Sequence, residues 1–263
     1  MKQKFDKNIH EKFKAYFDIK NNPSDIEKGF YKKTEKYLKY IKWIPGLKMV
    51  GIGNSIAMNS ATSDSDIDLY IVTSPNSMWL NRIIITLFFQ ILGVRKNEKH
   101  HSGRFCLSFF STTDGMDFSN WKLENDVYLY FWIVYFKPIL DYDNTYESFL
   151  EKNSSWADFG QYSEIIEENK KYVRYGTSYK DKTPLNSPLP AKDWTRIRGD
   201  EKQIDGIFVS NLNTILKKIF LPKTLKHFEE IGKPFGVIIN DDLLKFHNGD
   251  IREKIKKELI TSD

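Results

Sequence analysis

The feature that most constrains this chain of 263 residues is the segment Asp66-Ile67-Asp68-Leu69-Tyr70-Ile71-Val72. It combines β-branched and aromatic side chains with alternating carboxylates, which predicts a strand. Side chains two positions apart on a strand point to the same face, so we expect Asp66 and Asp68 to lie side by side. Adjacent carboxylates repel each other unless a cation lies between them, and Mg²⁺ or Mn²⁺ suits such oxygen ligands. The segment therefore predicts a strand that carries a divalent-cation site.

A turn of small residues, Gly53-Asn54-Ser55, precedes this segment and follows a predicted strand over residues 47–52. Its backbone N–H groups and the hydroxyl of Ser55 are suited to contacting phosphate groups. We expect a short helical turn over 56–58 and a polar loop over 59–65 to connect the turn to the aspartate strand. A candidate phosphate contact thus adjoins a candidate cation site.

Hydrophobic periodicity predicts the other elements. The expected helices cover residues 4–18, 24–42, 77–92, 124–136, about 204–232 and about 249–260. Ser24 is the expected cap of the second helix, and residues 105–110 are an expected strand. The helices over 77–92 and 124–136 are apolar around most of their circumference, so we expect them to be buried on several sides.

The order of these elements predicts an α/β (α+β) fold. We expect residues 1–150 to form a domain in which N-terminal helices precede a small mixed sheet flanked by helices. Residues 151–263 are expected to form a mostly helical C-terminal region, with loop-like stretches over 153–203 that include the proline-rich segment 183–190. A chain of this length can bury a sizeable core.

Composition narrows the class of protein without naming a partner. A formal net charge of +5 permits an anionic partner such as a nucleotide or RNA, and equally describes a solvated, lysine-rich surface. The N-terminus is polar, and no apolar run reaches the roughly 20 residues that span a bilayer, so we expect a cytoplasmic protein without membrane association. The single cysteine, Cys106, lies in an apolar run and is expected to be a buried small hydrophobe.

The Gly53-Asn54-Ser55 turn, ten intervening residues, and then Asp66-Ile67-Asp68-Leu69 resemble the Gly-Ser, spacer, Asp-x-Asp pattern of the polymerase-beta-like nucleotidyltransferase superfamily. The resemblance covers roughly residues 45–140. Such enzymes transfer a nucleoside monophosphate from a nucleoside triphosphate to an acceptor hydroxyl and release pyrophosphate, using two metal ions held by acidic residues. A narrower likeness, which includes Trp79, Arg82 and the 103–107 segment, is to bacterial nucleotidyltransferase-domain proteins and supplies no substrate.

The resemblance implies a sheet of the superfamily's type and a role for each matching residue. Asp66 and Asp68 would be catalytic and would hold Mg²⁺ or Mn²⁺. The residues that would contact the nucleotide are Gly53, Asn54, Ser55 and Ser65, joined by the basic side chains of Arg82 and Arg104. The acceptor is not implied: an RNA end, a protein side chain and a small molecule all remain open.

The chain departs from the superfamily pattern at two places. Asn54 stands where the family usually has glycine, so a left-handed turn there must be adopted by asparagine, the next most tolerant residue. A third carboxylate is usual on a later strand, where this chain presents Ser108; the acids of the adjoining segment are Asp114, Asp117, Glu124 and Asp126. The alternative hypothesis is therefore a catalytically inactive nucleotide-binding or interaction module on the same fold.

Basic residues near the motif in sequence are the next candidates. Arg82, Arg95, Lys96 and Arg104 could neutralise triphosphate charge. For Arg82, which interrupts an apolar helix, a structural ion pair is the alternative. For Arg95 and Lys96 the favoured interpretation is a solvated helix end.

Three further segments are interpreted mainly as structural. His100-His101 is expected in a surface loop rather than a zinc site. The segment 244–252 is expected to be a strand-to-helix junction capped by Asn248 or Asp250, with substrate contact by His247 or Arg252 as the alternative. A cluster suited to stacking and cationic contact with single-stranded nucleic acid, which makes RNA a possible partner, comprises Trp156, Trp194, Arg196 and Arg198.

Overall fold

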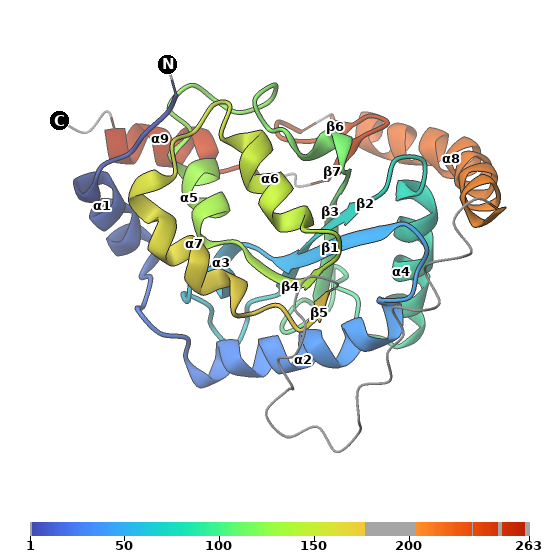
Figure 1. The fold of residues 1–263 in the computed structure, drawn as a ribbon, viewed down its shortest axis with the longest axis horizontal. Coiled ribbons are helices and arrows are strands. Elements are labelled where there is room, and N and C mark those ends of the chain that lie inside the picture. The colour runs from blue at the N-terminus through green and yellow to red at the C-terminus, as the bar shows by residue number, and fades with distance from the viewer. Residues whose placement is uncertain (1, 177–203, 233, 247–248, 261–263) are drawn as a thin grey trace.

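The computed structural model describes residues 2–176, 204–232, 234–246 and 249–260. The strands within these ranges are β1 (Leu47–Ile52), β2 (Ile67–Thr73), β3 (Phe105–Thr112), β4 (Lys137–Asp141), β5 (Tyr175–Gly176), β6 (Ile238–Ile239) and β7 (Leu243–Lys245). They form one mixed sheet in the order β5-β4-β1-β2-β3-β7-β6 (Figure 1). β1 pairs antiparallel with β2 and β4, whereas β2 and β3 run parallel, so the first residues of β2 and β3 lie at the same edge.

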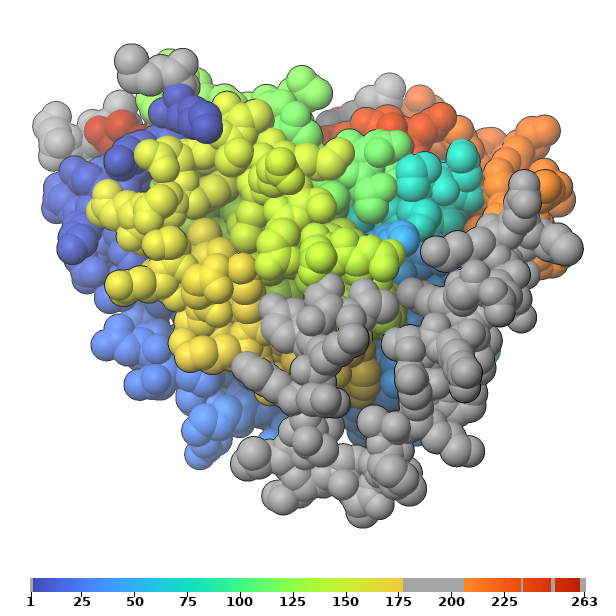
Figure 2. Space-filling model, viewed as in Figure 1, coloured from blue at the N-terminus to red at the C-terminus, as the bar shows by residue number. Residues whose placement is uncertain are grey.

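Helices cover both faces of this sheet (Figure 1). They are α1 (Lys7–Phe17), α2 (Asp25–Ile41), α3 (Asn54–Ala57), α4 (Met78–Ile91), α5 (Val127–Tyr135), α6 (Thr145–Asn153), α7 (Ser163–Lys170), α8 (Ile204–Glu230) and α9 (Arg252–Ile260). α1, α5, α6, α7 and α9 build the core on one face, whereas α2 and α4 build the core on the other, and α8 packs against α4. The space-filling view shows α6 and α7 at the surface in the middle of the face toward the viewer (Figure 2).

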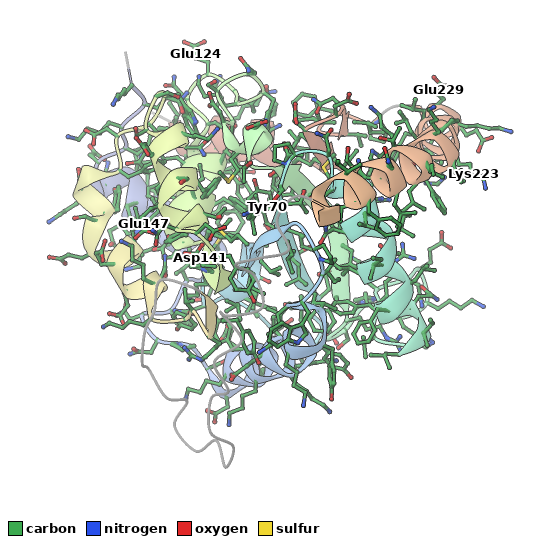
Figure 3. The ribbon with its side chains drawn as sticks, turned by 45° about the vertical axis from the view of Figure 1, so that its right-hand side comes forward. Tyr70, Glu124, Asp141, Glu147, Lys223 and Glu229 are labelled. Carbon is green, nitrogen blue, oxygen red and sulfur yellow. The ribbon has the colours of Figure 1, made fainter. Side chains whose placement is uncertain are left out.

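Alternation along β2 divides its side chains between the two cores. Ile67, Leu69 and Ile71 are buried in the core of α2 and α4. Tyr70 is buried on the other face in the core of α5, near the centre of the molecule (Figure 3). Because residues two apart share a face, Asp68 lies on the side of Tyr70, at the edge of the α5 core.

The helix cap predicted at the start of α2 is observed. Ser24 caps α2 and forms a capping box, in which its side chain accepts from the backbone of Glu27 while the Glu27 carboxylate accepts from the backbone N–H of Ser24. α5 is buried along almost its whole length, as predicted. For α4 the prediction of burial on several sides is wrong for one face, where Ile84, Leu87 and Ile91 are 38%, 55% and 82% exposed.

The predicted class, α/β (α+β) with helices flanking a mixed sheet, is confirmed. The region after residue 150 is not only helical, because β5, β6 and β7 extend the sheet at both edges and α9 packs on α5. The proline-rich segment 183–190 lies outside the described residues. No helix in the described part of the chain combines the length and the apolarity needed to cross a membrane.

Candidate functional site

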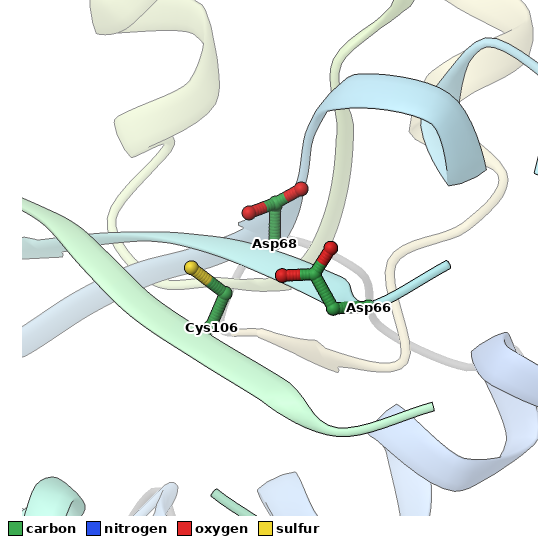
Figure 4. Close-up of side chains that lie close together, drawn as sticks. All are labelled: Asp66, Asp68 and Cys106. Atoms are coloured by element: carbon green, nitrogen blue, oxygen red, sulfur yellow. The ribbon is translucent and has the colours of Figure 1, made fainter. Parts of the chain in front are cut away.

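The site is built where β2 and β3 begin side by side. Asp66 immediately precedes β2, Asp68 is its second residue, and the parallel register places Cys106 of β3 opposite Asp68. The carboxylates and the thiol lie on the same side of the two strands (Figure 4). Their ligand atoms all lie within 4.8 Å of one another, close enough to share one metal ion. The structure thus brings together the two aspartates that the sequence singled out and adds a thiol.

Asn54 holds Asp68 from the β1 side. Its backbone is left-handed, with φ of +53°, which is the conformation that the departure from glycine was expected to require. The Asn54 side-chain nitrogen donates to Asp68 Oδ2 at 2.8 Å. Its oxygen accepts from Trp132 Nε1 at 2.9 Å and from the Tyr128 hydroxyl at 3.1 Å. Because an indole N–H can only donate, these contacts fix which end of the amide faces the aspartate.

Gly53 is required by the packing of Trp132. A Cβ at this position would lie 2.7 Å from Trp132 Nε1, so only glycine lets the indole reach Asn54. The Gly53 N–H donates to the backbone oxygen of Asp68 at 3.1 Å and ties the turn to β2. Ser55 lies in the short helix α3 and is half-buried. The Ser65 hydroxyl accepts from the backbone of Thr62 at 3.0 Å and closes the loop before β2.

Lys96 supplies positive charge to the aspartate pair. Its Nζ lies 2.6 Å from Asp66 Oδ2. Burial disfavours the ammonium, but the hydrogen bond to Asp66 and the nearby charges of Asp66 and Asp68 raise the pKa of Lys96 on balance. The interpretation of Lys96 as a solvated helix end is therefore wrong: the backbone of Lys96 pairs with the start of β3, and this places its side chain at the site.

Cys106 is buried, as predicted, but it lies beside charge. Burial and the charge of Asp68 raise the pKa of the Cys106 thiol to about 12, so the thiol is protonated at neutral pH. Its Sγ donates to the Ser108 hydroxyl at 3.2 Å. Ser108, where an acid was expected, is not the β3 residue opposite the pair, because Cys106 is the residue that pairs with Asp68.

None of the four acids considered as a third ligand joins the group formed by the aspartates and Cys106. Asp126 is fully buried, where it caps α5 and forms an ion pair with Arg252 at 3.0 Å. Asp114 and Glu124 are exposed, and Figure 3 shows Glu124 at the edge of the molecule. The Asp117 carboxylate accepts from the backbone of Ser119 at 2.9 Å. Within the described residues, the third ligand-bearing side chain is thus a thiol.

A cavity with aromatic walls opens beside Asp68. Its volume is about 200 Å³. The aromatic residues that line it are Tyr70, Phe109, Trp121, Tyr128 and Trp132. The indole N–H of Trp121 is buried and has no acceptor among the described residues. Flat apolar walls are suited to a planar heteroaromatic group.

The segment 249–252 closes this cavity. The sequence left helix capping and substrate contact as alternatives for this segment, and its residues both cap α9 and line the cavity. Asp250 accepts from the backbone N–H of Arg252 at 3.1 Å and so stabilises the start of α9. Arg252 also lines the cavity, as does Asp250, and the two side chains form an ion pair at 2.9 Å. His247 and Asn248 lie outside the described residues.

A second cavity, of about 390 Å³, lies between α4, β3 and α8. We call it the basic cavity, because its polar lining is dominated by Arg82, Arg95, Lys96, Lys223 and His227. No aspartate or glutamate occurs among the described residues that line it. It also takes in Cys106 and Ser108, and Ser108 lines both cavities, so the two cavities adjoin at β3.

The Arg82 guanidinium is stacked rather than paired. It lies 4.1 Å from the centre of the Phe246 ring, and no carboxylate among the described residues forms an ion pair with it. Burial, with the nearby charge of Arg95, lowers the pKa of Arg82 to about 10. The proposed structural ion pair of Arg82 is therefore not observed in the described part of the chain.

Of the remaining candidates, those that the structure describes lie outside both cavities. Arg104 donates to the backbone oxygen of Gly93, and His100 and His101 are exposed, as expected for a surface loop. Trp156 is only 5% exposed and its Nε1 donates to Asn153, so it offers no surface for stacking a base. The other members of that cluster, Trp194, Arg196 and Arg198, lie outside the described residues.

Comparison of the chain with protein-family models, with curated proteins and with solved structures finds no match. Any assignment of chemistry therefore depends on the motif and on the geometry of the site.

Proposed function

We propose that the chain is a nucleotidyltransferase of the polymerase-beta-like kind, which transfers a nucleoside monophosphate from a nucleoside triphosphate to an acceptor hydroxyl and depends on Mg²⁺ or Mn²⁺. The observation that carries the proposal is the position of the aspartate pair. Asp66 and Asp68 share one face at the start of β2, with the Asn54 turn on one side and basic side chains on the other.

The donor set at this position is compatible with Mg²⁺ through its two carboxylates. Mg²⁺ is commonly bound by one or two carboxylates together with substrate phosphates and water, so Asp66 and Asp68 would suffice to hold it. A cysteine sulfur is a poor ligand for this hard cation, so the two carboxylates and not Cys106 would hold it. When bound, the ion would neutralise phosphate charge and activate the attacking hydroxyl. Lys96, which now contacts Asp66, would turn toward a phosphate oxygen.

Different residues of the chain would contact the base and the phosphates of a nucleotide. The base would enter the aromatic cavity, where it stacks on side chains such as Trp132 and accepts a hydrogen bond from Trp121. The α- and β-phosphates would lie against the Gly53-Asn54-Ser55 turn. Asn54, held by Trp132 and Tyr128, keeps Asp68 oriented as these groups bind.

A second candidate function is a nucleotide-binding module without catalysis. One observation favours it: the β3 residue that pairs with Asp68 is Cys106, a thiol, whereas a third carboxylate is usual in enzymes of this kind. Such a module would bind a nucleoside triphosphate in the same place but would not release pyrophosphate.

Pyrophosphate release separates the two functions. Each of the four nucleoside triphosphates is incubated with Mg²⁺ or Mn²⁺ and a panel of acceptors, and binding is measured in parallel. We expect metal-dependent release that is lost in Asp66→Asn and Asp68→Asn. The matched control is Asp64→Asn, which removes an exposed carboxylate from the same loop and should leave the rate unchanged. Binding without release would favour the module, and absence of nucleotide binding would contradict both functions.

A further inference from the structure

We propose that the basic cavity binds a phosphate group of the acceptor, so that the acceptor is itself a phosphate-bearing molecule. The assignment to the acceptor depends on the proposed function. Phosphate binding by the cavity does not, because it requires neither metal nor turnover.

The first support is the composition of the cavity. Arg82 comes from α4, Arg95 and Lys96 come from the connection to β3, and Lys223 and His227 come from α8. Lys96 has Asp66 as its partner, but no carboxylate among the described lining residues compensates Arg82, Arg95 and Lys223, and such a group of cationic side chains is unfavourable without an anion. An anion that accepts several hydrogen bonds at once, such as a phosphate group, matches this arrangement.

The second support is the state of Arg82. Its guanidinium is largely buried and stacks on Phe246, which leaves the edge of the group, with its N–H donors, available for a ligand. No carboxylate among the described residues forms an ion pair with Arg82, a buried charge without a counter-ion is costly, and Arg95 adds repulsion. Binding of a phosphate would relieve both costs.

The third support is the place of the cavity relative to the aspartate pair. The Asn54 turn contacts Asp68 from the β1 side, whereas the basic cavity includes Cys106 and Ser108 of β3 and therefore lies on the opposite side. In phosphoryl and nucleotidyl transfer the attacking and leaving oxygens lie roughly in line. If the pyrophosphate group leaves along the Asn54 turn, the acceptor hydroxyl arrives from the side of β3. The basic cavity is positioned to hold that reactant.

The position also gives α8 a function. Lys223 is an exposed residue of α8, and Figure 3 shows it on the outer part of that helix. Phe228 of α8 stacks on Phe246, with ring centres 5.3 Å apart, so the helix is fixed against the segment that also contacts Arg82. The C-terminal region would thus complete a substrate site that begins in the sheet.

The test measures binding of ribose 5-phosphate by calorimetry in the absence of metal, with ribose as the uncharged comparison. We expect ribose 5-phosphate to bind and ribose not to bind. Arg82→Leu and Lys223→Leu should each weaken binding by roughly tenfold or more, the usual order for loss of a charge-assisted hydrogen bond. Lys226→Leu is the matched control, because it removes the same charge from the same helix at a position that does not line the cavity. Lys223 is exposed, so its variant remains informative even if Arg82→Leu fails to fold.

A second titration is carried out in the presence of a saturating, non-hydrolysable nucleoside triphosphate and distinguishes the acceptor from the donor. Retained binding of ribose 5-phosphate supports an acceptor site. Competitive displacement would overturn the proposal and assign the cavity to the triphosphate, while leaving the proposed function intact. Absence of binding, or equal binding by Lys223→Leu and Lys226→Leu, would also overturn it.

Discussion

Asn54 donates from its side-chain nitrogen to Asp68, and the oxygen of the same amide is held by Trp132 and Tyr128 of α5. The contact connects the turn after β1, the aspartate strand and the buried helix through one side chain. Because Asn54 is also left-handed, its identity satisfies a backbone requirement and a hydrogen-bonding requirement together.

Substitution of Asn54 separates these two requirements. Asn54→Gly keeps the left-handed backbone but leaves the Trp132 and Tyr128 donors without their acceptor, which costs about 1–3 kcal/mol. Asn54→Ala has the same loss and must also hold alanine in the left-handed region, at a further cost of about 1–2 kcal/mol. Urea unfolding should therefore rank wild type above Asn54→Gly and Asn54→Ala lowest. Equal stability of the two variants would show that the backbone conformation is not a constraint.

Gly53→Ala tests the close approach of Trp132. The added Cβ would lie within 2.7 Å of the indole nitrogen, so the ring must move away from Asn54. We expect the free energy of unfolding to fall by about 1–3 kcal/mol, as in other overpacked cores. Gly206→Ala is the control, since nothing lies within 4 Å of its Cβ and alanine favours a helix. A neutral Gly53→Ala would contradict the packing described for Trp132.

Lys96→Met should strengthen divalent-cation binding. In the absence of a metal ion the Lys96 ammonium contacts Asp66, and it competes with a cation for that oxygen. Without it, the two carboxylates repel each other, and Mg²⁺ or Mn²⁺ relieves that repulsion. Thermal unfolding should show a larger rise in Tm per added Mn²⁺ for Lys96→Met than for wild type. Lys99→Met, at an exposed loop position, should behave as wild type. A smaller Tm rise for Lys96→Met than for wild type would contradict competition between the Lys96 ammonium and the cation for Asp66.

Loss of the proton from the buried Asp141 carboxyl should lower the free energy of unfolding as the pH rises from about 4 to 6. This carboxyl is 1% exposed, and its burial raises its pKa to about 6. Between its unfolded and folded pKa values the folded state binds more protons, so the free energy of unfolding decreases with pH, by at most about 1.4 kcal/mol per unit. Asp141→Asn should flatten this slope in urea titrations, whereas Asp64→Asn, at an exposed loop position whose charge does not act on Asp141, should not. An unchanged slope in Asp141→Asn would contradict this assignment.

The parts of the site that follow from local sequence were predictable. Alternation along 66–72 predicted a strand with Asp66 and Asp68 on one face, and β2 covers Ile67–Thr73 with that arrangement. Comparison with the superfamily pattern implied that a left-handed residue in the Gly53-Asn54-Ser55 turn would be Asn54, and Asn54 adopts that conformation. Both predictions depend on residues that are close in sequence, where steric and periodic rules act directly.

β4 was not predicted, for a local reason. Pro138 is its second residue, and proline in a strand that pairs on both sides contradicts the usual pattern. The strand tolerates it at a register shift in the pairing with β1, opposite Gly51. The apolar run of α5 also continues into β4 with Phe136 alone between them, so no turn residue marks the boundary.

The other residues of the site come together through tertiary contacts. Lys96 reaches Asp66 across the β2–β3 pair, and Arg252 reaches Asp126 from the far end of the chain. Periodicity does not say which strands pair, so neither contact follows from it. Cys106 is different: once β2 and β3 are taken as parallel neighbours, their register places it opposite Asp68. The strand over 105–110 was predicted, but the sequence did not indicate that it pairs with the aspartate strand.

The central claim is that Asp66 and Asp68 form a divalent-cation site, and Mn²⁺ binding followed by electron paramagnetic resonance tests it most directly. The titration is performed with wild type, Asp66→Asn, Asp68→Asn and the control Asp64→Asn, each in the presence of a non-hydrolysable nucleoside triphosphate. The free-nucleotide background is subtracted from each curve. We predict a protein-dependent Mn²⁺ site in wild type and Asp64→Asn that is lost or strongly weakened in the other two variants. Equal Mn²⁺ binding by all four proteins would contradict the account.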